Sequence, residues 1–325
     1  MLFNVCALYI KIMNNENQTI HKSDDNLTIY GWNEKLNQLK QESIYSALAH
    51  GRVSIVHRTC YEVISGNGLF QCELTGNMMY GKSDDELPCT GDWVIFQPFD
   101  EHKGIIVDRL PRERTLYRKK SGTVADKQAI ASYVDKAFIV QSLDDNFNVR
   151  RVERFMVQIM EENISSVLVL NKADLDFDRQ SVEEQIKHIS SQIPVFFTSI
   201  HQLETIVRLR KSISEGETVV FVGSSGVGKS SLVNALCEKP VLLTSDISLS
   251  TGKGRHTSTR REMVLMDSSG VLIDTPGVRE FGLAIDNPDS LAEVLEISDY
   301  AELCRFKDCK HINEPGCAVL EAVNS

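Results

Sequence analysis

Short apolar segments separated by glycine-containing turns characterise the first third of the chain. They run over residues 52–56, 60–64, 69–74, 92–96 and 104–107, with turns such as Ser65-Gly-Asn-Gly68 between them. Five short strands in about sixty residues are typical of a small β-barrel of the OB kind, which often binds RNA. The alternative is a barrel used only for protein contacts. This region contains the aromatic residues Tyr61, Phe70, Tyr80 and Phe99. Aromatic side chains can stack on bases, but core packing is their more common function.

Farther along, the apolar runs are continuous, as in strands buried on both faces of a sheet. Such runs cover residues 166–170, 193–197, 218–222 and 271–274. Residues 230–237 have the apolar spacing of a helix instead. Residues 262–267 and 271–274 flank Ser268-Ser-Gly270, which predicts a β-hairpin. This part of the chain is therefore predicted to be an α/β domain.

A phosphate-binding loop lies between the strand 218–222 and the helix 230–237. The segment Gly223-Ser224-Ser225-Gly226-Val227-Gly228-Lys229-Ser230-Ser231 contains the full G-x-x-x-x-G-K-S pattern. A strand, a glycine loop and a helix start together place backbone N–H groups around phosphates, at the positive end of the helix dipole. Lys229 is expected to reach the β- and γ-phosphates, and Ser230 to bind Mg²⁺. A chance glycine loop is disfavoured because the pattern and its flanks agree.

A second motif would read the base. Asn171-Lys172-Ala173-Asp174 follows the strand 166–170. The Asp174 carboxylate can accept hydrogen bonds from guanine N1 and N2, a donor pair that adenine lacks, so Asp174 would select GTP over ATP. Asn171 can bond the base edge, and the stem of Lys172 can cover its face. Thr198-Ser199, after the strand 193–197, is the candidate for a further loop beside the base.

The third motif is Asp274-Thr-Pro-Gly277, at the end of the strand 271–274. Asp274 would hold Mg²⁺ through water, and the Gly277 N–H would contact the γ-phosphate. The glycine-rich, basic segment 250–261 occupies the place of switch I, whose threonine binds Mg²⁺ when the γ-phosphate is present. Thr257 and Thr259 both qualify, and a merely flexible basic loop is the alternative interpretation.

The order of these motifs is unusual. In the common GTP-binding domain the phosphate loop comes first and the Asn-Lys-x-Asp element comes near the end, whereas here residues 171–174 precede residues 223–231. This order predicts a circularly permuted GTPase. Val278 stands where many GTPases carry a glutamine that orients the attacking water, and valine has no such function. His256 is the nearest titratable candidate; a phosphate or RNA contact, or simple solvation, are its alternatives. We therefore expect slow intrinsic hydrolysis that a partner accelerates.

A cysteine cluster lies near the C-terminus. Cys304, Cys309, His311 and Cys317 fall within fourteen residues and form a Cys₃His set suited to tetrahedral Zn²⁺. The set is complete, which predicts a structural zinc site; a disulfide pair with bystanders is the alternative. The remaining cysteines are scattered, and Cys237, on the predicted phosphate-loop helix, is expected to be packed.

Composition and charge narrow the class of protein. A chain of 325 residues with 42% hydrophobic and 25% charged residues suggests two or three ordinary globular domains. No apolar run approaches the length of a membrane span, and the apolar opening 1–12 lacks the features of a signal peptide; Met13 is an alternative start. The net charge of −10 argues against general nucleic-acid binding. Local basic clusters instead suit a specific RNA-rich partner, with solvated surface charge as the alternative; they comprise Arg112, Arg114, Arg118, Lys119 and Lys120, then Arg150, Arg151 and Arg154, then Lys253, Arg255, Arg260 and Arg261.

Taken together, these motifs resemble the RsgA family of circularly permuted GTPases, which depend on the small ribosomal subunit. The resemblance covers nearly everything from Tyr30 onward and includes Gly91-Asp-Trp-Val, residues 112–118, residues 252–259 and residues 274–283. It implies a multidomain α/β protein: an OB barrel over 45–112, a permuted P-loop GTPase domain with a Ras-like sheet over 113–283, and a zinc-binding C-terminal domain over 284–325. The preceding residues 1–44 are predicted to be an N-terminal extension that is partly disordered and has no counterpart in the family. By matching positions, His256 aligns with a histidine implicated in hydrolysis, and the Cys₃His set aligns with the zinc ligands.

The resemblance also implies a function: a GTP hydrolase that acts in late maturation of the small (30S) subunit and is stimulated by that subunit. It implies a cytoplasmic monomer that uses GTP, Mg²⁺ and one structural Zn²⁺ and contacts 16S rRNA and ribosomal proteins. The chain departs from the family pattern in ending at Ser325, eight residues past Cys317, which suggests truncation, and in having Thr257-Ser258-Thr259 for an all-threonine run. Two alternatives remain: a translation- or tRNA-related GTPase, and an RNA-binding scaffold with weak GTPase activity.

Overall fold

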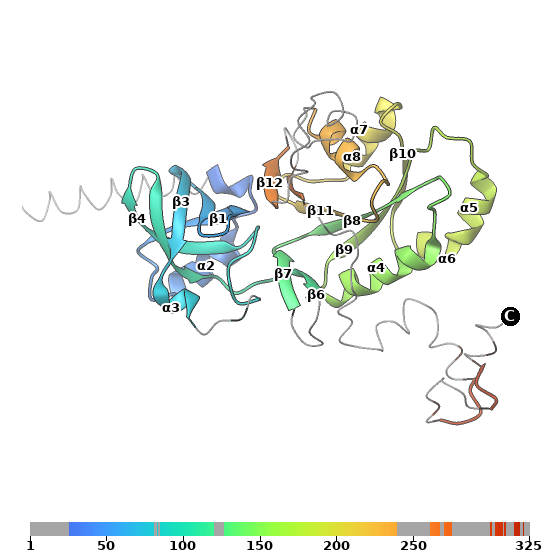
Figure 1. The fold of residues 1–325 in the computed structure, drawn as a ribbon, viewed down its shortest axis with the longest axis horizontal. Helices are drawn as coiled ribbons and strands as arrows, with labels where there is room; N and C mark the ends of the chain where they lie inside the picture. Colours follow the sequence, from blue (N-terminus) through green and yellow to red (C-terminus); the bar gives the residue numbers. More distant parts are fainter. Residues whose placement is uncertain are drawn as a thin grey trace, which may run out of the picture.

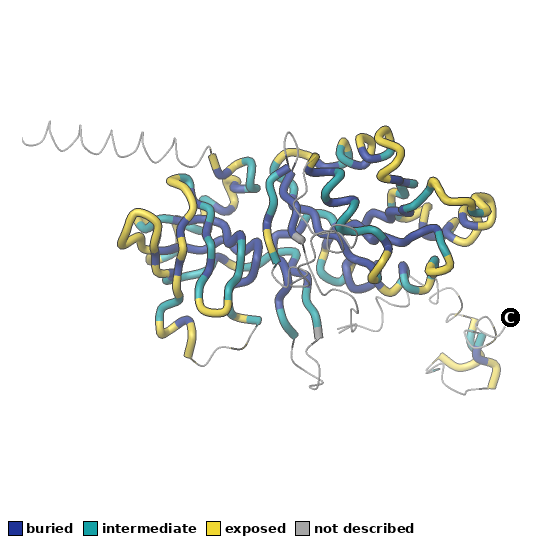
Figure 2. The backbone as a smooth tube through the Cα atoms, turned by 45° about the horizontal axis from the view of Figure 1, so that its top comes forward, coloured by how far each residue is buried: buried dark blue, intermediate teal, exposed yellow. Residues whose placement is uncertain are grey.

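A computed structural model describes residues 26–80, 83, 85–119, 127–238, 261–266 and 270–274, and near the C-terminus residues 300, 303–307, 309, 315–318 and 321. The described chain forms a β-barrel beside a larger α/β unit, and β12 lies between the two (Figure 1). Buried residues follow the strands of both parts, while exposed residues gather at the turns and in the outer helices (Figure 2). Within the described residues, no helix combines the length and the apolar character that a bilayer crossing needs.

The barrel consists of β1 (Ala49–Val56), β2 (Tyr61–Ser65), β3 (Gly68–Leu74), β4 (Trp93–Asp100) and β5 (Lys103–Arg109). β1, β2 and β3 form an antiparallel meander, β3 pairs in parallel with β5, and β5 pairs with β4. Pairing of β4 back onto β1, with Ala49 opposite Phe96, closes the barrel. The predicted OB-like barrel is therefore confirmed, and closure leaves none of its strands with an unpaired edge.

The aromatic residues of the barrel divide into two groups. Tyr61 and Phe70 belong to its buried core. Tyr80, which follows α3 (Gly76–Met79), is 85% exposed, and Phe99 on β4 is 62% exposed. Only the second pair is therefore available for stacking on a base or packing against a partner.

The chain before the barrel packs onto it. Helix α2 (Glu34–Glu42) begins after Asn33, whose side chain accepts a hydrogen bond from the Leu36 N–H as an N-cap. Leu27, Trp32 and Leu36 are buried, and the Trp32 ring meets Trp93 of the barrel edge-on at 4.9 Å between centroids. The described part of the predicted extension 1–44 is thus an integral piece of the barrel unit.

The α/β unit is built on a sheet with the order β10-β9-β8-β11-β13-β12. The strands are β8 (Lys136–Ser142), β9 (Ser165–Asn171), β10 (Val195–Thr198), β11 (Thr218–Val222), β12 (Glu262–Leu265) and β13 (Val271–Asp274). β8, β9, β10, β11 and β13 are parallel. β12 is antiparallel to β13, which confirms the predicted hairpin. A second, two-stranded sheet is formed by β6 (Leu116–Lys119) and β7 (Lys127–Ala131).

Helices enclose this sheet and create a hydrophobic core on each face. The helices are α4 (Val149–Glu161), α5 (Arg179–Gln185), α6 (Lys187–Ser190), α7 (Leu203–Lys211) and α8 (Lys229–Leu236). Alternate residues of β8 enter different cores: Ile139 packs with Met156 of α4, and Val140 packs with Leu232 of α8. Cys237 is buried in the second core, as expected from the sequence. Because side chains alternate along a strand, a strand covered on both faces is apolar along most of its length. All of β11 is buried, and its residues after Thr218 are apolar.

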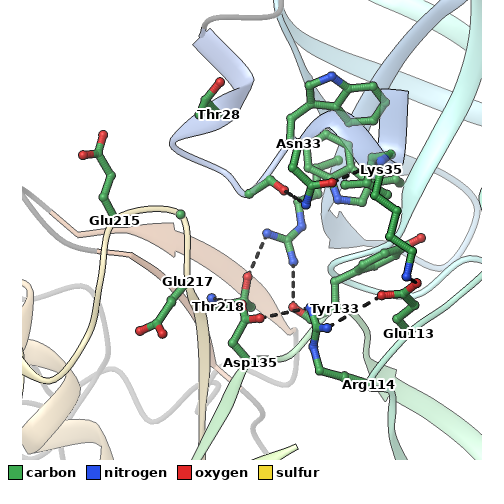
Figure 3. A pocket seen from close by; sticks show the side chains of 16 residues that line it. Thr28, Asn33, Lys35, Glu113, Arg114, Tyr133, Asp135, Glu215, Glu217 and Thr218 are labelled. Atoms are coloured by element: carbon green, nitrogen blue, oxygen red, sulfur yellow. Dashed lines mark hydrogen bonds and ion pairs between the residues drawn. The ribbon is translucent and has the colours of Figure 1, made fainter. Parts of the chain in front are cut away.

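One buried cation joins the barrel to the α/β unit. Arg52 of β1 is 1% exposed and donates to the Gly91 carbonyl at 3.0 Å, to Thr218 Oγ1 at 2.8 Å and to the Tyr30 carbonyl. Burial lowers the pKa of Arg52 to about 10, so the guanidinium remains charged at neutral pH. Beside it lies a pocket of about 300 Å³ with charged side chains on its wall. There Arg114 pairs with Asp135, and Lys35 pairs with Glu113 (Figure 3).

These contacts fix the start of β11, the strand that leads into the phosphate loop. The Thr218 hydroxyl accepts a hydrogen bond from Arg52, and the Thr218 N–H donates to Asp135 Oδ2 at 2.7 Å. A single pairing, Ile55 opposite Glu262, also joins β1 to β12 and makes the two sheets continuous. The barrel is thus attached both to the phosphate-loop strand and to the strand that follows the predicted switch segment.

Candidate nucleotide-binding site

The phosphate loop joins the central strand β11 to α8, as the sequence predicts. Its three glycines have left-handed backbone angles, with φ of +144° at Gly223, +83° at Gly226 and +92° at Gly228. A Cβ atom on Gly223 would lie 2.3 Å from the Val140 carbonyl oxygen, and one on Gly228 would lie 2.3 Å from Asn171 Nδ2. Two of the glycines are therefore required by space as well as by backbone conformation.

Lys229 lies along this loop. Its Nζ donates to the carbonyls of Gly223 at 2.7 Å and Ser224 at 2.6 Å. Ser230 and Ser231 follow in the first turn of α8 and are half-buried, while Ser225 and Gly226 are exposed at the tip. Val227 is fully buried and anchors the loop in the core shared by α7 and α8. A cation and a helix N-terminus thus lie beside an exposed loop tip, an arrangement that attracts phosphate.

Asn171 connects the predicted base-reading segment to the phosphate loop. Its Nδ2 donates to the Val227 carbonyl at 2.8 Å, and its Oδ1 accepts from Thr198 Oγ1 at 3.2 Å. Asn171 is only 3% exposed. The sequence suggested a bond from Asn171 to the base edge; the structure adds a bracing function that holds three separate segments together.

Asp174 meets the second predicted loop beside the base. The hydrogen bond that its carboxylate accepts from Ser199 lowers the pKa of Asp174, so this exposed group is anionic at neutral pH. The backbone reinforces the contact, because the Ala173 N–H donates to the Thr198 carbonyl at 3.0 Å. Residues 171–174 and 198–199 therefore lie together at the carboxyl ends of neighbouring parallel strands.

Lys172 has a partner on a neighbouring strand end that the sequence interpretation missed. Its Nζ lies 2.8 Å from Asp144 Oδ2, in the turn after β8. The available signal was positional: Asp144 follows a buried strand, and the carboxyl ends of parallel strands share one edge of the sheet.

Some residues of the basic cluster predicted just after the barrel form ion pairs within the protein. Arg112 makes a two-pronged ion pair with the buried Asp92, with Nε 2.9 Å from Oδ1 and Nη2 2.6 Å from Oδ2. Arg114 pairs with Asp135 at 3.0 Å. Arg150 and Arg154 of α4 are exposed instead, so these two can meet an external partner.

Several predicted site residues are described in part or not at all. β13 pairs in parallel with β11, so Asp274, which ends β13, lies at the same edge of the sheet as the phosphate loop. Its backbone is described and its side chain is not. His256, Thr257, Thr259, Gly277 and His311 lie outside the described residues, and their functions remain predictions.

Three of the four predicted zinc ligands come together. The Sγ atoms of Cys304, Cys309 and Cys317 all lie within 4.8 Å of one another. Cys304 Sγ and Cys317 Sγ are 3.9 Å apart, too far for a disulfide bond. Sulfur atoms on a tetrahedral zinc are about 3.8 Å apart, given Zn–S bonds of about 2.3 Å. The donor set and its spacing therefore fit Zn²⁺.

The described fold and site define a circularly permuted GTPase. In it β9, the strand that leads into residues 171–174, precedes the phosphate-loop strand β11 in the chain and lies two places from it in the sheet. Residues 109–284 match the family model described as RsgA GTPase. The chain belongs to the RsgA GTPase family and is a GTP-hydrolysing enzyme.

Individual relatives agree with this assignment. The small ribosomal subunit biogenesis GTPase RsgA 1 of Bacteroides thetaiotaomicron is 74% identical over 313 residues, which cover 96% of this chain and 86% of the relative. The small ribosomal subunit biogenesis GTPase RsgA of Methanosarcina acetivorans is 38% identical over 96% of this chain and 85% of its own.

Two solved structures share the architecture. YjeQ from Thermotoga maritima has a TM-score of 0.61 and 27% sequence identity, covering 85% of this chain and 91% of its own. YloQ, described as a circularly permuted GTPase, has a TM-score of 0.59 over 87% of this chain and 90% of its own. At 22% identity, YloQ shows the fold alone.

Proposed function

We propose that this protein is a GTP-driven assembly factor that acts late in the maturation of the small ribosomal subunit and is stimulated by that subunit. The observation that carries the proposal is the 74% identity, over nearly the whole chain, to a relative named a small ribosomal subunit biogenesis GTPase. The phosphate loop, the base-side loops and the barrel described above supply the parts that a GTP-switched RNA binder needs. We further propose that the protein is a cytoplasmic monomer whose partners are 16S rRNA and ribosomal proteins.

The residues of the nucleotide site divide the work between phosphate and base. Backbone N–H groups of residues 223–228 and the Lys229 ammonium would surround the β- and γ-phosphates and stabilise charge that develops on them. Asp174 would accept from the guanine N1 and N2 groups. The Gly277 N–H would contact the γ-phosphate.

Hydrolysis also requires a metal and a way to orient water. Ser230 and Asp274, with Thr257 or Thr259, offer the oxygen ligands that Mg²⁺ prefers. When bound, Mg²⁺ neutralises charge on the β- and γ-phosphate oxygens. His256 is proposed to orient or deprotonate the attacking water, a function for which Val278 has no suitable group. Contact with the subunit would order the switch segment, and loss of the γ-phosphate would release the protein.

The test is GTP hydrolysis by the full chain, measured with and without purified small subunits, with large subunits and tRNA as separate additions. Strong stimulation by small subunits alone is expected. Stimulation by tRNA or by whole ribosomes in place of small subunits would favour a translation- or tRNA-related GTPase. Tight GTP binding with no stimulation by any of these would contradict the proposed partner.

Substitution of a cluster cysteine tests the proposed zinc site. Cys304, Cys309 and Cys317, with His311, would hold one structural Zn²⁺. Cys317→Ser is expected to lower the zinc content from about one ion per chain to near zero, because a complete set of four ligands is needed for tight structural binding. Affinity for GDP should be unchanged, since the phosphate loop shares no residue with the cluster.

The readout is metal analysis by mass spectrometry beside GDP titration. Cys60→Ser, which changes a half-buried cysteine of the barrel unit, is the control. Full zinc content in the Cys317→Ser protein would contradict the assignment.

A further inference from the structure

The turn after β8 carries an acidic side chain that is held in one orientation from several directions. Asp144 Oδ1 accepts from Ser142 Oγ at 2.6 Å and from the Asn146 N–H at 3.0 Å. Its other oxygen, Oδ2, receives the Lys172 ammonium at 2.8 Å. One carboxylate oxygen is thus fixed by its own turn, and the other is presented to the base-reading segment.

Lys172 is held at both ends. Its backbone is in the left-handed region, with φ of +62°, a conformation that costs energy for any residue other than glycine. Two backbone hydrogen bonds hold this conformation. The Ala173 N–H donates to the Thr198 carbonyl, and the Leu175 N–H donates to the Lys172 carbonyl. The ion pair with Asp144 then fixes the far end of a long side chain that would otherwise sample many rotamers.

We propose that Asp144 is a positioning residue for the guanine base and acts through Lys172. The inference rests on the proposed function of residues 171–174 in base binding. With its ammonium bound to Asp144, the stem of Lys172 is set as a preformed wall against which the base can lie. A group ordered before binding loses no rotamer freedom on binding, so the preformed wall raises affinity for the nucleotide.

The charge state of Asp144 supports this function. Partial burial acts to raise the pKa of Asp144, but the hydrogen bonds from Lys172, Ser142 and Asn146 outweigh it and lower the pKa to about 2. The carboxylate is therefore anionic at neutral pH. The adjacent Asp145 is exposed, and no hydrogen bond or ion pair joins its side chain to another described residue.

The experiment compares four variants of the full chain: Asp144→Asn, Asp145→Asn, Lys172→Ala and the double variant Asp144→Asn with Lys172→Ala. The probe is a fluorescent GDP analogue, with the dissociation constant and the dissociation rate as readouts. Asp144→Asn keeps the shape and the acceptor for its turn but loses the charge. Its dissociation constant is expected to rise by about 5- to 20-fold, as a charge-assisted hydrogen bond at a half-exposed site suggests. Asp145→Asn is the matched control and should change it by less than about twofold.

Two further readouts separate positioning from general damage to the turn. At saturating GTP, kcat of Asp144→Asn should stay within about twofold of the unsubstituted protein while KM rises, because a lost base contact weakens binding of ground and transition states alike. In the Lys172→Ala background, Asp144→Asn should have almost no additional effect, since the two residues act as one unit.

Either of two results would overturn the inference. The first is that Lys172→Ala weakens GDP binding but Asp144→Asn has the same dissociation constant as Asp145→Asn. This result would overturn the function of Asp144 alone. An Asp144→Asn effect that persists in full in the Lys172→Ala background would show that the carboxylate acts on its own turn and not through the lysine. The Asp174→Asn variant tests the proposed base site separately. A failure of the base site can therefore be distinguished from either of these two results.

Discussion

Replacement of Lys229 by alanine is expected to lower GTP hydrolysis by about a hundred- to a thousandfold, because removal of one preorganised donor to developing charge typically has an effect of that size. In the structure the Lys229 ammonium lies against the carbonyls of Gly223 and Ser224, at the centre of the phosphate loop. No other described lysine lies within this loop. Phosphate release under single-turnover conditions, with GTP bound at saturation, measures the chemical step.

The control for this variant is Lys211→Ala, which removes an exposed cation from the last turn of α7. It alters the net charge equally but should leave hydrolysis unchanged. Hydrolysis by Lys229→Ala within tenfold of the unsubstituted protein would contradict the function assigned to the phosphate loop, and with it the proposed enzyme mechanism.

Replacement of Asp174 by asparagine is expected to change the base that the protein binds. In the proposed site, guanine would present two donors, N1–H and the N2 amino group, to the Asp174 carboxylate, which is hydrogen-bonded by Ser199 and anionic at neutral pH. An asparagine amide opposes one of these donors with a donor of its own. The loss of two charge-assisted hydrogen bonds should weaken GDP binding by about a hundredfold or more. Xanthine carries a carbonyl where guanine carries the N2 amino group, so xanthosine diphosphate should bind the variant better than GDP does.

Calorimetric titration with GDP and with xanthosine diphosphate measures both changes. Asp176→Asn, which neutralises an exposed acid two residues farther along the same loop, is the matched control and should keep the preference for GDP. An Asp174→Asn protein that still binds GDP within threefold of the unsubstituted protein would contradict the base-reading function of Asp174.

Local patterns predicted most of the elements that surround the site. The glycine loop, the strand before it and the helix after it were all expected, and β11 matches its predicted range 218–222. The five barrel strands and the β12–β13 hairpin were also predicted, with ends that differ by a few residues. These predictions succeed because turns and apolar runs are encoded by neighbouring residues, whose backbone preferences act over short distances.

Other features depend on partners far away in the chain and had no local signal. Arg112 resembles its basic neighbours in sequence, yet it is buried against Asp92. Arg52 lies in an ordinary strand pattern, but its partner Thr218 is 166 residues away. Tyr61 and Phe70 could not be distinguished from Tyr80 and Phe99 until the closure of the barrel assigned each to the inside or the outside.

The motifs that carry the proposed chemistry are visible in the sequence alone. A phosphate loop needs closely spaced glycines, one lysine and one hydroxyl, and guanine recognition needs one carboxylate. Both are therefore visible in short motifs, and their order shows the permutation. The way these motifs support one another required the folded structure. Asn171 reaches Val227, Asp144 reaches Lys172 and Arg52 reaches Thr218 because sheet order and register bring remote segments to one edge or one junction, and such contacts depend on the packing of the whole domain.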